Sequence, residues 1–131
     1  MQTMIAPPPT MRPWNVAEIR QHLLEGRQLI ASGQLEVAAV RLWTAFEEAV
    51  RFSLTELGQT TDDPIWISDT PYGLSAQAVA YGVIDPEDRD VLLHFLSARD
   101  TASHGNMEAV DSSILQKVGW FAERTLNEMG Q

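Results

Sequence analysis

The residues from Gln34 to Leu57 repeat apolar side chains at intervals of three and four, which is the period of an α-helix. The apolar stripe consists of Ala38, Leu42, Ala45, Phe46, Ala49 and Phe52. The opposite stripe is polar and consists of Arg41, Thr44, Glu48, Arg51 and Thr55. Because such a helix must bury its apolar stripe, the segment predicts a core helix at 34–57 that packs against other helices. Gly58 follows and predicts a left-handed C-terminal cap.

Four further segments carry helix signals. Asn15 and Glu18 have the spacing of a capping box, which predicts a helix at 15–31 that Ser32 and Gly33 end. Asp85 and Pro86 predict the start of a helix that runs to about 104. A short helix at 74–81 and a last helix at 109–129 complete the set, and no β-hairpin signal is present. The expected fold is therefore all-α, an up-and-down bundle of four long helices and one short helix.

Two segments differ from the helical pattern. Residues 1–14 contain four prolines and are expected to form a flexible, proline-rich leader, with the helical domain at 15–131. Residues 59–71 form a polar loop with Asp62, Asp63 and Asp69. Ile65, Trp66 and Ile67 in this loop are expected to fold back onto the core.

The composition limits the possible functions. The chain has 131 residues, enough for one domain, and 18 acidic against 9 basic residues give a net charge of -9. This charge argues against general binding of nucleic acid through its phosphates. Cysteine is absent, which excludes disulfides, thiolate zinc sites and cysteine nucleophiles. We expect a cytoplasmic chain without a membrane span, because no apolar run approaches ~20 residues and the first residues lack a signal-peptide pattern.

Several kinds of site have no support in the pattern. The glycines fall in no phosphate-binding loop, and the serines lie in no nucleophile elbow. The aspartates of the polar loop lack the spacing of a calcium loop. His22 has no second ligand at metal-binding spacing and is expected to be a partly buried structural histidine. No metal and no cofactor are expected.

Arg99 and His104 are the residues best suited to catalysis. An arginine can neutralise the charge that develops on a phosphoryl group, and a histidine can transfer a proton near neutral pH. Together they can cleave a phosphodiester without a metal if the attacking group is the ribose 2′-hydroxyl, so the substrate would be RNA. Five residues at about 100° each place the two side chains roughly 140° apart on one helix. Either the helix breaks before Gly105, or a second copy of the chain completes the site.

A second pair, Arg89 and His94, has the same spacing. The residues between Arg89 and His94 include Val91, Leu92 and Leu93, which are bulky core material, and we expect this pair to lie on a solvated flank of the helix. Thr101, Ala102 and Ser103 are small and Gly105 follows, which leaves room for a substrate at the first pair.

The arginine, the polar residue after it and the histidine, on a late helix of a small bundle, resemble the R-x4-6-H motif of the HEPN superfamily. The resemblance covers about residues 15–129 by helix pattern. It implies a metal-independent endoribonuclease, often a toxin of a toxin-antitoxin system or a defence component, that acts as a homodimer. It also implies a nucleotidyltransferase-type antitoxin as a possible partner.

Carried over from the family, Arg99 and His104 are the catalytic pair. Asp100, Ser103 and Asn106 are the supporting or substrate-binding residues. Many such toxins have a tyrosine at the position of Asn106, which the partner can adenylylate, and many have an asparagine at the position of Asp100. The alternative function is a non-catalytic helical module for dimerisation or partner binding, which the acidic charge favours.

Overall fold

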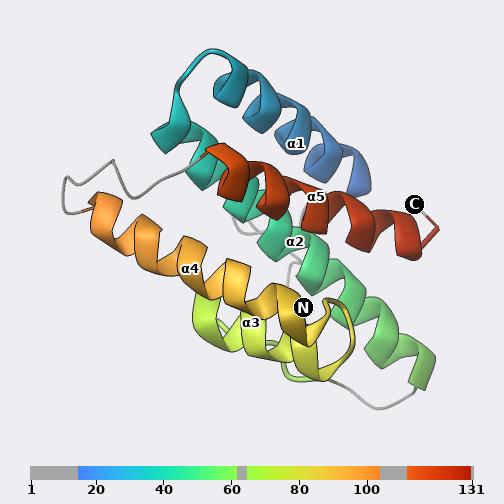
Figure 1. Ribbon diagram of the computed structural model, residues 1–131. Helices are drawn as coiled ribbons and strands as arrows, with labels where there is room; N and C mark the ends of the chain where they lie inside the picture. The colour runs from blue at the N-terminus through green and yellow to red at the C-terminus, as the bar shows by residue number, and fades with distance from the viewer. Residues whose placement is uncertain (1–14, 62–64, 104–111, 131) are drawn as a thin grey trace, which may run out of the picture.

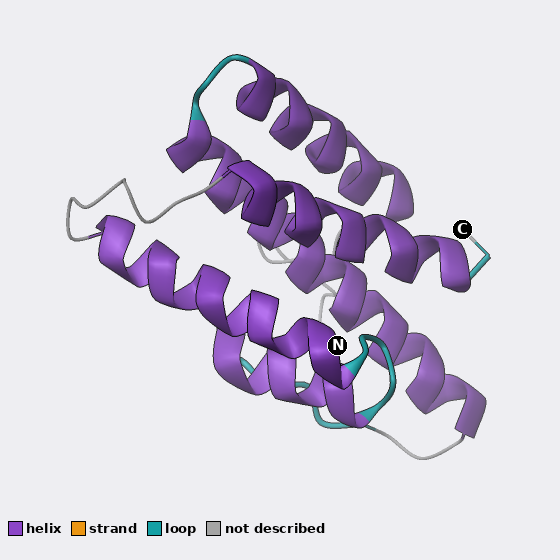
Figure 2. Ribbon diagram, viewed as in Figure 1, coloured by secondary structure: helices purple, strands orange, loops and turns teal. Residues whose placement is uncertain are grey.

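The structure is a computed structural model that describes residues 15–61, 65–103 and 112–130, with side chains for all of these except 61 and 98–103. It contains five helices (Figures 1 and 2): α1 (Val16–Ala31), α2 (Leu35–Thr61), α3 (Pro71–Ala80), α4 (Pro86–Ser103) and α5 (Ser112–Glu128). The described residues form no strand. The prediction of an all-α fold with four long helices and one short helix is confirmed.

The start of α1 is fixed by the predicted capping box. The Asn15 side chain accepts a hydrogen bond from the backbone N–H of Glu18 at 2.9 Å, and the Glu18 side chain accepts one from the N–H of Asn15. Gly33 has a φ of 81°, a conformation that glycine adopts without strain, so the chain turns into α2 directly after α1 ends. The predicted boundaries of this helix are confirmed to within one residue.

The end of α2 differs from the prediction. Gly58 lies inside the helix, which continues to Thr61, so the predicted cap at Gly58 is wrong. A glycine in a helix interior costs about 1 kcal/mol, which is too little by itself to end a helix. The Thr60 side chain donates a hydrogen bond to the carbonyl of Glu56 across Gly58, which is a contact within the continuing helix.

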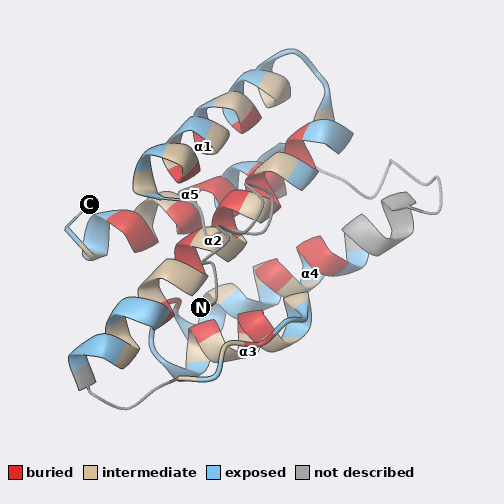
Figure 3. Ribbon diagram, turned by 180° about the vertical axis from the view of Figure 1, so that it is seen from behind, coloured by how far each residue is buried: buried red, intermediate tan, exposed pale blue. Residues whose placement is uncertain are grey.

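The hydrophobic core surrounds α2 (Figure 3), with α1 and α5 packed against it and the pair α3 and α4 beside them. Phe46 is fully buried as predicted, but Trp43, which lies outside the predicted stripe, is fully buried as well. The Trp43 ring stacks on Phe95 of α4 at 5.4 Å. Because helices cover α2 on more than one side, its buried face is wider than a single stripe.

Glycines let α1 and α5 approach α2 closely at Leu42. A Cβ added to Gly26 of α1 would lie 2.5 Å from the Leu42 Cδ2 atom, and one added to Gly119 of α5 would lie 3.3 Å from it. Leu42 is fully buried between these two glycines. Two polar contacts, from Arg20 to Asn127 and from Arg27 to Glu123, show that α1 and α5 are antiparallel.

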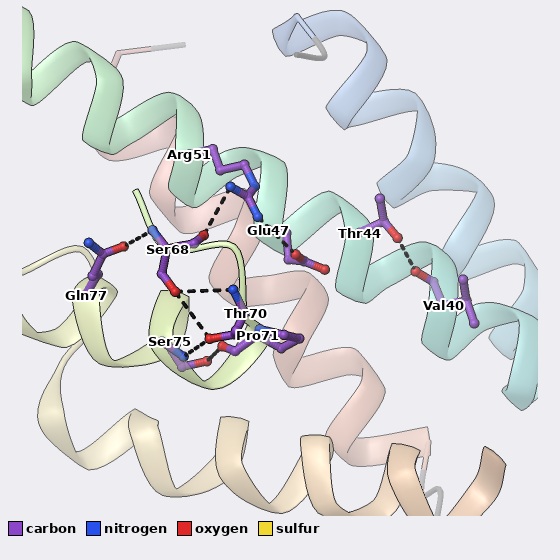
Figure 4. A network of polar contacts seen from close by, with 10 residues as sticks. Val40, Thr44, Glu47, Arg51, Ser68, Thr70, Pro71, Ser75 and Gln77 are labelled. Atoms are coloured by element: carbon purple, nitrogen blue, oxygen red, sulfur yellow. Dashed lines mark hydrogen bonds and ion pairs between the residues drawn. The ribbon is translucent and has the colours of Figure 1, made fainter. Parts of the chain in front are cut away.

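The segment before α3 is held by polar contacts to α2 (Figure 4). Arg51 donates to the carbonyl of Ser68 at 3.3 Å, and the Ser68 N–H donates to the Gln77 side chain at 2.8 Å. Trp66 is 76% exposed, so the expectation that it folds onto the core is wrong, whereas Ile67 is partly buried against the core. The Trp66 carbonyl accepts a hydrogen bond from Gln77, which holds the backbone while the indole projects outward.

Arg124 connects α5 to the start of α4. Its Nη1 atom lies 3.8 Å from Oδ2 of Asp85, and its Nη2 atom lies 3.6 Å from Oδ2 of Asp88. These ion pairs join α5 to the start of α4. Glu128 of α5 lies 3.7 Å from the same side chain. The start of α4 therefore lies beside the end of α5, and the two helices are antiparallel.

Candidate functional site

The structure places part of the predicted catalytic site. Arg99, Asp100 and Ser103 lie in the last turns of α4, and their side chains are outside the described ones. His104 and Asn106 lie outside the described residues. Ser103, the last described residue of α4, comes directly before His104 in the sequence. The pairing of Arg99 with His104 therefore stays a prediction, as does the family resemblance built on it.

The end of α4 lies at the same end of the molecule as the turn between α1 and α2 and the start of α5 (Figure 1). Residues 104–111 join α4 to α5, so His104 lies between these two helices in the sequence. The first turns of α5 are the described residues that follow His104 most closely in the chain.

An open hollow of about 580 Å³ lies between α1 and the first turns of α5. We call it the α1–α5 hollow. Its lining consists of Arg27, Ile30, Ser113, Gln116, Lys117 and Trp120. Two cations, two polar side chains and one indole therefore face a common space that is open to solvent.

The two helix segments around the α1–α5 hollow contain no acidic residue, although the chain has 18. Residues 26–35 contain Arg27, and residues 112–122 contain Lys117, the single lysine of the chain. Arg27 pairs with Glu123, the first acid beyond this stretch. Among the described carboxylates, none forms an ion pair with Lys117. The charge around the hollow is thus locally positive on an acidic chain.

Trp120 is held in place from the α4 side. The Arg124 guanidinium lies over its ring, 4.8 Å from the centroid, and the Phe121 ring is tilted against it at 5.6 Å. Trp120 remains 50% exposed and borders the hollow. Because Arg124 is anchored by ion pairs, the indole is a fixed aromatic surface with one side toward the hollow.

A second hollow, of about 340 Å³, provides a contrast at the other end of α5. Its lining includes Glu56, Glu128 and Tyr81, and none of the residues described around it is basic. A polyanion would be repelled there, whereas the α1–α5 hollow can attract one.

The second arginine–histidine pair and His22 lie where the sequence analysis expected them. Arg89 and His94 are both exposed on α4, as expected for a solvated flank. His22 is partly buried, and its Nδ1 lies 3.1 Å from Arg41, which also donates to Glu25 at 2.6 Å. Burial lowers the pKa of His22 below 6.5 and Arg41 lowers it further, while Glu25 and Glu18 act in the opposite direction.

No metal site is formed by the described part of the chain, where no group of three or more potential ligands comes together. Asp69 is exposed, and Asp62 and Asp63 lie outside the described residues. Within the same part of the chain, no helix has the length and apolar character that crossing a membrane requires.

The sequence analysis did not predict the α1–α5 hollow. Two acid-free stretches, 26–35 and 112–122, are its signal in the sequence. That signal gains meaning only when the fold brings α1 and α5 side by side. When the chain is compared with protein-family models, with curated proteins and with solved structures, none of the three comparisons returns a match.

Proposed function

We propose that this chain is a HEPN-like, homodimeric, metal-independent endoribonuclease, with Arg99 and His104 as its catalytic pair. The observation that carries the proposal is the position of the motif: Arg99 lies in the last turns of a long helix of an all-α domain, and His104 directly follows the described end of that helix. In an unbroken helix the two side chains would lie roughly 140° apart, so the proposal requires either that the helix break before Gly105 or that a second copy of the chain complete the site.

The chemistry requires one proton transfer from the nucleophile and one to the leaving group. The ribose 2′-oxygen attacks the adjacent phosphorus and loses its proton, while the bond from phosphorus to the 5′-oxygen breaks and that oxygen gains a proton. His104 transfers protons, and Arg99 neutralises the charge on the phosphoryl oxygens. The products are a 2′,3′-cyclic phosphate and a 5′-hydroxyl, so DNA is not a substrate.

The overall acidity of the chain is the main argument against an RNA substrate. The α1–α5 hollow supports the proposal because it places a local positive charge and an exposed indole on the first half of α5, the helix that follows His104 in the chain. Local charge is what an RNA strand meets within a Debye length of about 8 Å at physiological salt. A net charge of -9 is therefore compatible with a local RNA-binding site.

Cleavage of single-stranded RNA in the presence of EDTA tests the proposal. We expect the parent chain to produce fragments with 2′,3′-cyclic phosphate ends, and His104→Ala and Arg99→Ala to be slower by at least about 100-fold, the usual contribution of a positioned acid–base group. Arg89→Ala and His94→Ala are matched controls on the same helix and should cleave like the parent. Equal cleavage by all five proteins, or none by the parent, would refute the proposal.

A non-catalytic dimerisation or partner-binding module is the second candidate, and the net charge of -9 favours it. A dimer in light scattering with no cleavage in the assay above would support this alternative. Growth arrest on expression of the parent chain, and its absence with His104→Ala, would favour the nuclease and its role as a toxin or defence component.

A further inference from the structure

We infer that the α1–α5 hollow binds one nucleotide of a single-stranded RNA, with its base on Trp120 and its phosphate between Lys117 and Arg27. The inference rests on the proposed function, because that function makes RNA the substrate. It adds a substrate-binding site that is separate from Arg99 and His104. The hollow has a volume of about 580 Å³ and is open to solvent, so a strand that continues on both sides can enter it.

Trp120 has the properties of a stacking surface. It is half exposed, and contacts with Arg124 and Phe121 fix its orientation, so a base that stacks on it does not first have to order the ring. Every base has an aromatic face, so this contact binds RNA with little sequence preference. The side chain of Gln116 lines the same hollow and can form hydrogen bonds with a base edge.

The cations of the hollow suit a phosphate. Lys117 extends from α5, and no described carboxylate neutralises it by an ion pair. Arg27 extends from α1 and is oriented by Glu123, which leaves part of its guanidinium fork for a second acceptor. Glu123 balances the charge of Arg27, and Lys117 adds a positive charge that no described carboxylate balances by an ion pair, so a phosphate in the hollow meets net positive charge.

The position of the hollow agrees with a role beside the proposed catalytic pair. Gln116 and Lys117 lie in the second turn of α5, shortly after the segment that contains His104. Figure 1 shows the start of α5 and the end of α4 at the same end of the molecule.

The test measures RNA binding without cleavage. In a His104→Ala background, fluorescence anisotropy with a labelled single-stranded RNA of ten nucleotides gives the affinity. We expect Trp120→Ala to bind about 10-fold more weakly, which is within the usual range for loss of one stacked base, and Trp120→Phe to retain most of the affinity. Lys117→Gln should weaken binding. It should also make the slope of log affinity against log salt concentration less steep by about 0.7, the value for one phosphate contact on a single strand.

Matched controls lie elsewhere on the surface. Trp66→Ala removes an indole that is 76% exposed, and Arg89→Gln removes an exposed cation of α4, so neither should change RNA affinity. Thermal melting of each variant confirms that its fold is retained. The inference is overturned if the parent does not bind RNA, if the hollow variants bind like the parent, or if Trp66→Ala weakens binding as much as Trp120→Ala.

The outcomes of the two experiments separate the inference from the proposed function. Cleavage that depends on His104, together with unchanged binding by the Trp120 and Lys117 variants, supports the nuclease and refutes the hollow as its RNA site. Binding that depends on Trp120 and Lys117, without cleavage by the parent, supports the hollow and refutes the nuclease. Binding of an acidic peptide in place of RNA refutes the inference.

Discussion

The group α1, α2 and α5 and the pair α3 and α4 are held together by different means. In the first group, glycines bring the helix backbones close to Leu42, and the contact is apolar and tight. The pair also has an apolar contact with the first group, Phe95 of α4 on Trp43 of α2, but its ends are fastened by polar links. Arg124 holds the start of α4, and Arg51 holds the segment before α3.

Because of this difference, the helices that contribute most to stability are not the helix that carries the proposed catalytic arginine. Close packing has few ways to adjust, so the first group should dominate the free energy of unfolding. The helix that leads to His104 belongs to the second group. Substitution of Arg99 near the end of α4 should therefore change function with little effect on the fold, whereas substitutions around Leu42 should affect the whole domain.

The largest expected effect is that of Leu42→Ala. The side chain is fully buried, and the glycines that face it have no side chains to fill the space, so we expect a loss of about 3–5 kcal/mol in the free energy of unfolding. Leu92→Ala on α4, also fully buried, should cost about 2–3 kcal/mol. Urea denaturation measures both free energies of unfolding. An equal or larger loss for Leu92→Ala would show that the packing around Leu42 does not dominate the stability.

Gly26→Ala should have the next largest effect. The new Cβ would lie 2.5 Å from Cδ2 and 2.6 Å from Cγ of Leu42, so either the buried leucine or the helix must move. Overpacking of this kind costs about 1–3 kcal/mol and outweighs the gain of about 1 kcal/mol from the better helix former. Gly119→Ala is the matched control, because its Cβ would lie 3.3 Å from Leu42. Its stability should stay within about 1 kcal/mol of the parent.

Arg124→Gln should weaken the attachment of α4 and leave the group α1, α2 and α5 intact. It removes the ion pairs with Asp85 and Asp88, and because these are partly exposed we expect a loss of about 1 kcal/mol. Hydrogen exchange should show faster opening of the first turns of α4, with α1 and α2 unchanged. Uniform acceleration in all helices would show that α4 is not held separately.

The smallest effect is the pH dependence contributed by His22. Its pKa is lowered in the native state, so the unfolded chain binds the proton more tightly, and stability rises with pH in the window below 6.5. The stability that the neutral His22 ring contributes is fully present above pH 6.5, and it is lost as the pH falls toward the lower native pKa. His22→Gln should flatten the stability profile below about pH 6.5, the window between the pKa values of the unfolded and native states.

An NMR titration of the His22 ring provides the direct measurement. Arg41→Met should raise the pKa of His22, because the guanidinium at 3.1 Å lowers it in the parent. A pKa of His22 at or above 6.5 in the folded parent would contradict the prediction and remove the pH sensitivity assigned to the contact between α1 and α2.

Local signals predicted the helices well, because each signal depends on neighbours in the chain. Asn15 with Glu18, and Pro86 at the start of α4, act within one helical turn. Gly58 misled the prediction because a glycine can end a helix or lie inside one, and the cost of about 1 kcal/mol inside a helix is small enough for α2 to continue to Thr61. Trp43 and Trp66 show the same limit: one is fully buried by α4 and the other is 76% exposed, and no local pattern distinguishes them.

The sequence by itself determined that the chain is helical, where α1 and α4 begin, and which arginine and histidine are close in the chain, since these properties depend on local periodicity, capping and spacing. Only the tertiary structure decided that Leu42 lies between two glycines, that Trp43 is buried, and that Arg27, Lys117 and Trp120 share one hollow. The physical reason is that burial and electrostatic fields come from residues far apart in the chain, and folding alone brings those residues together.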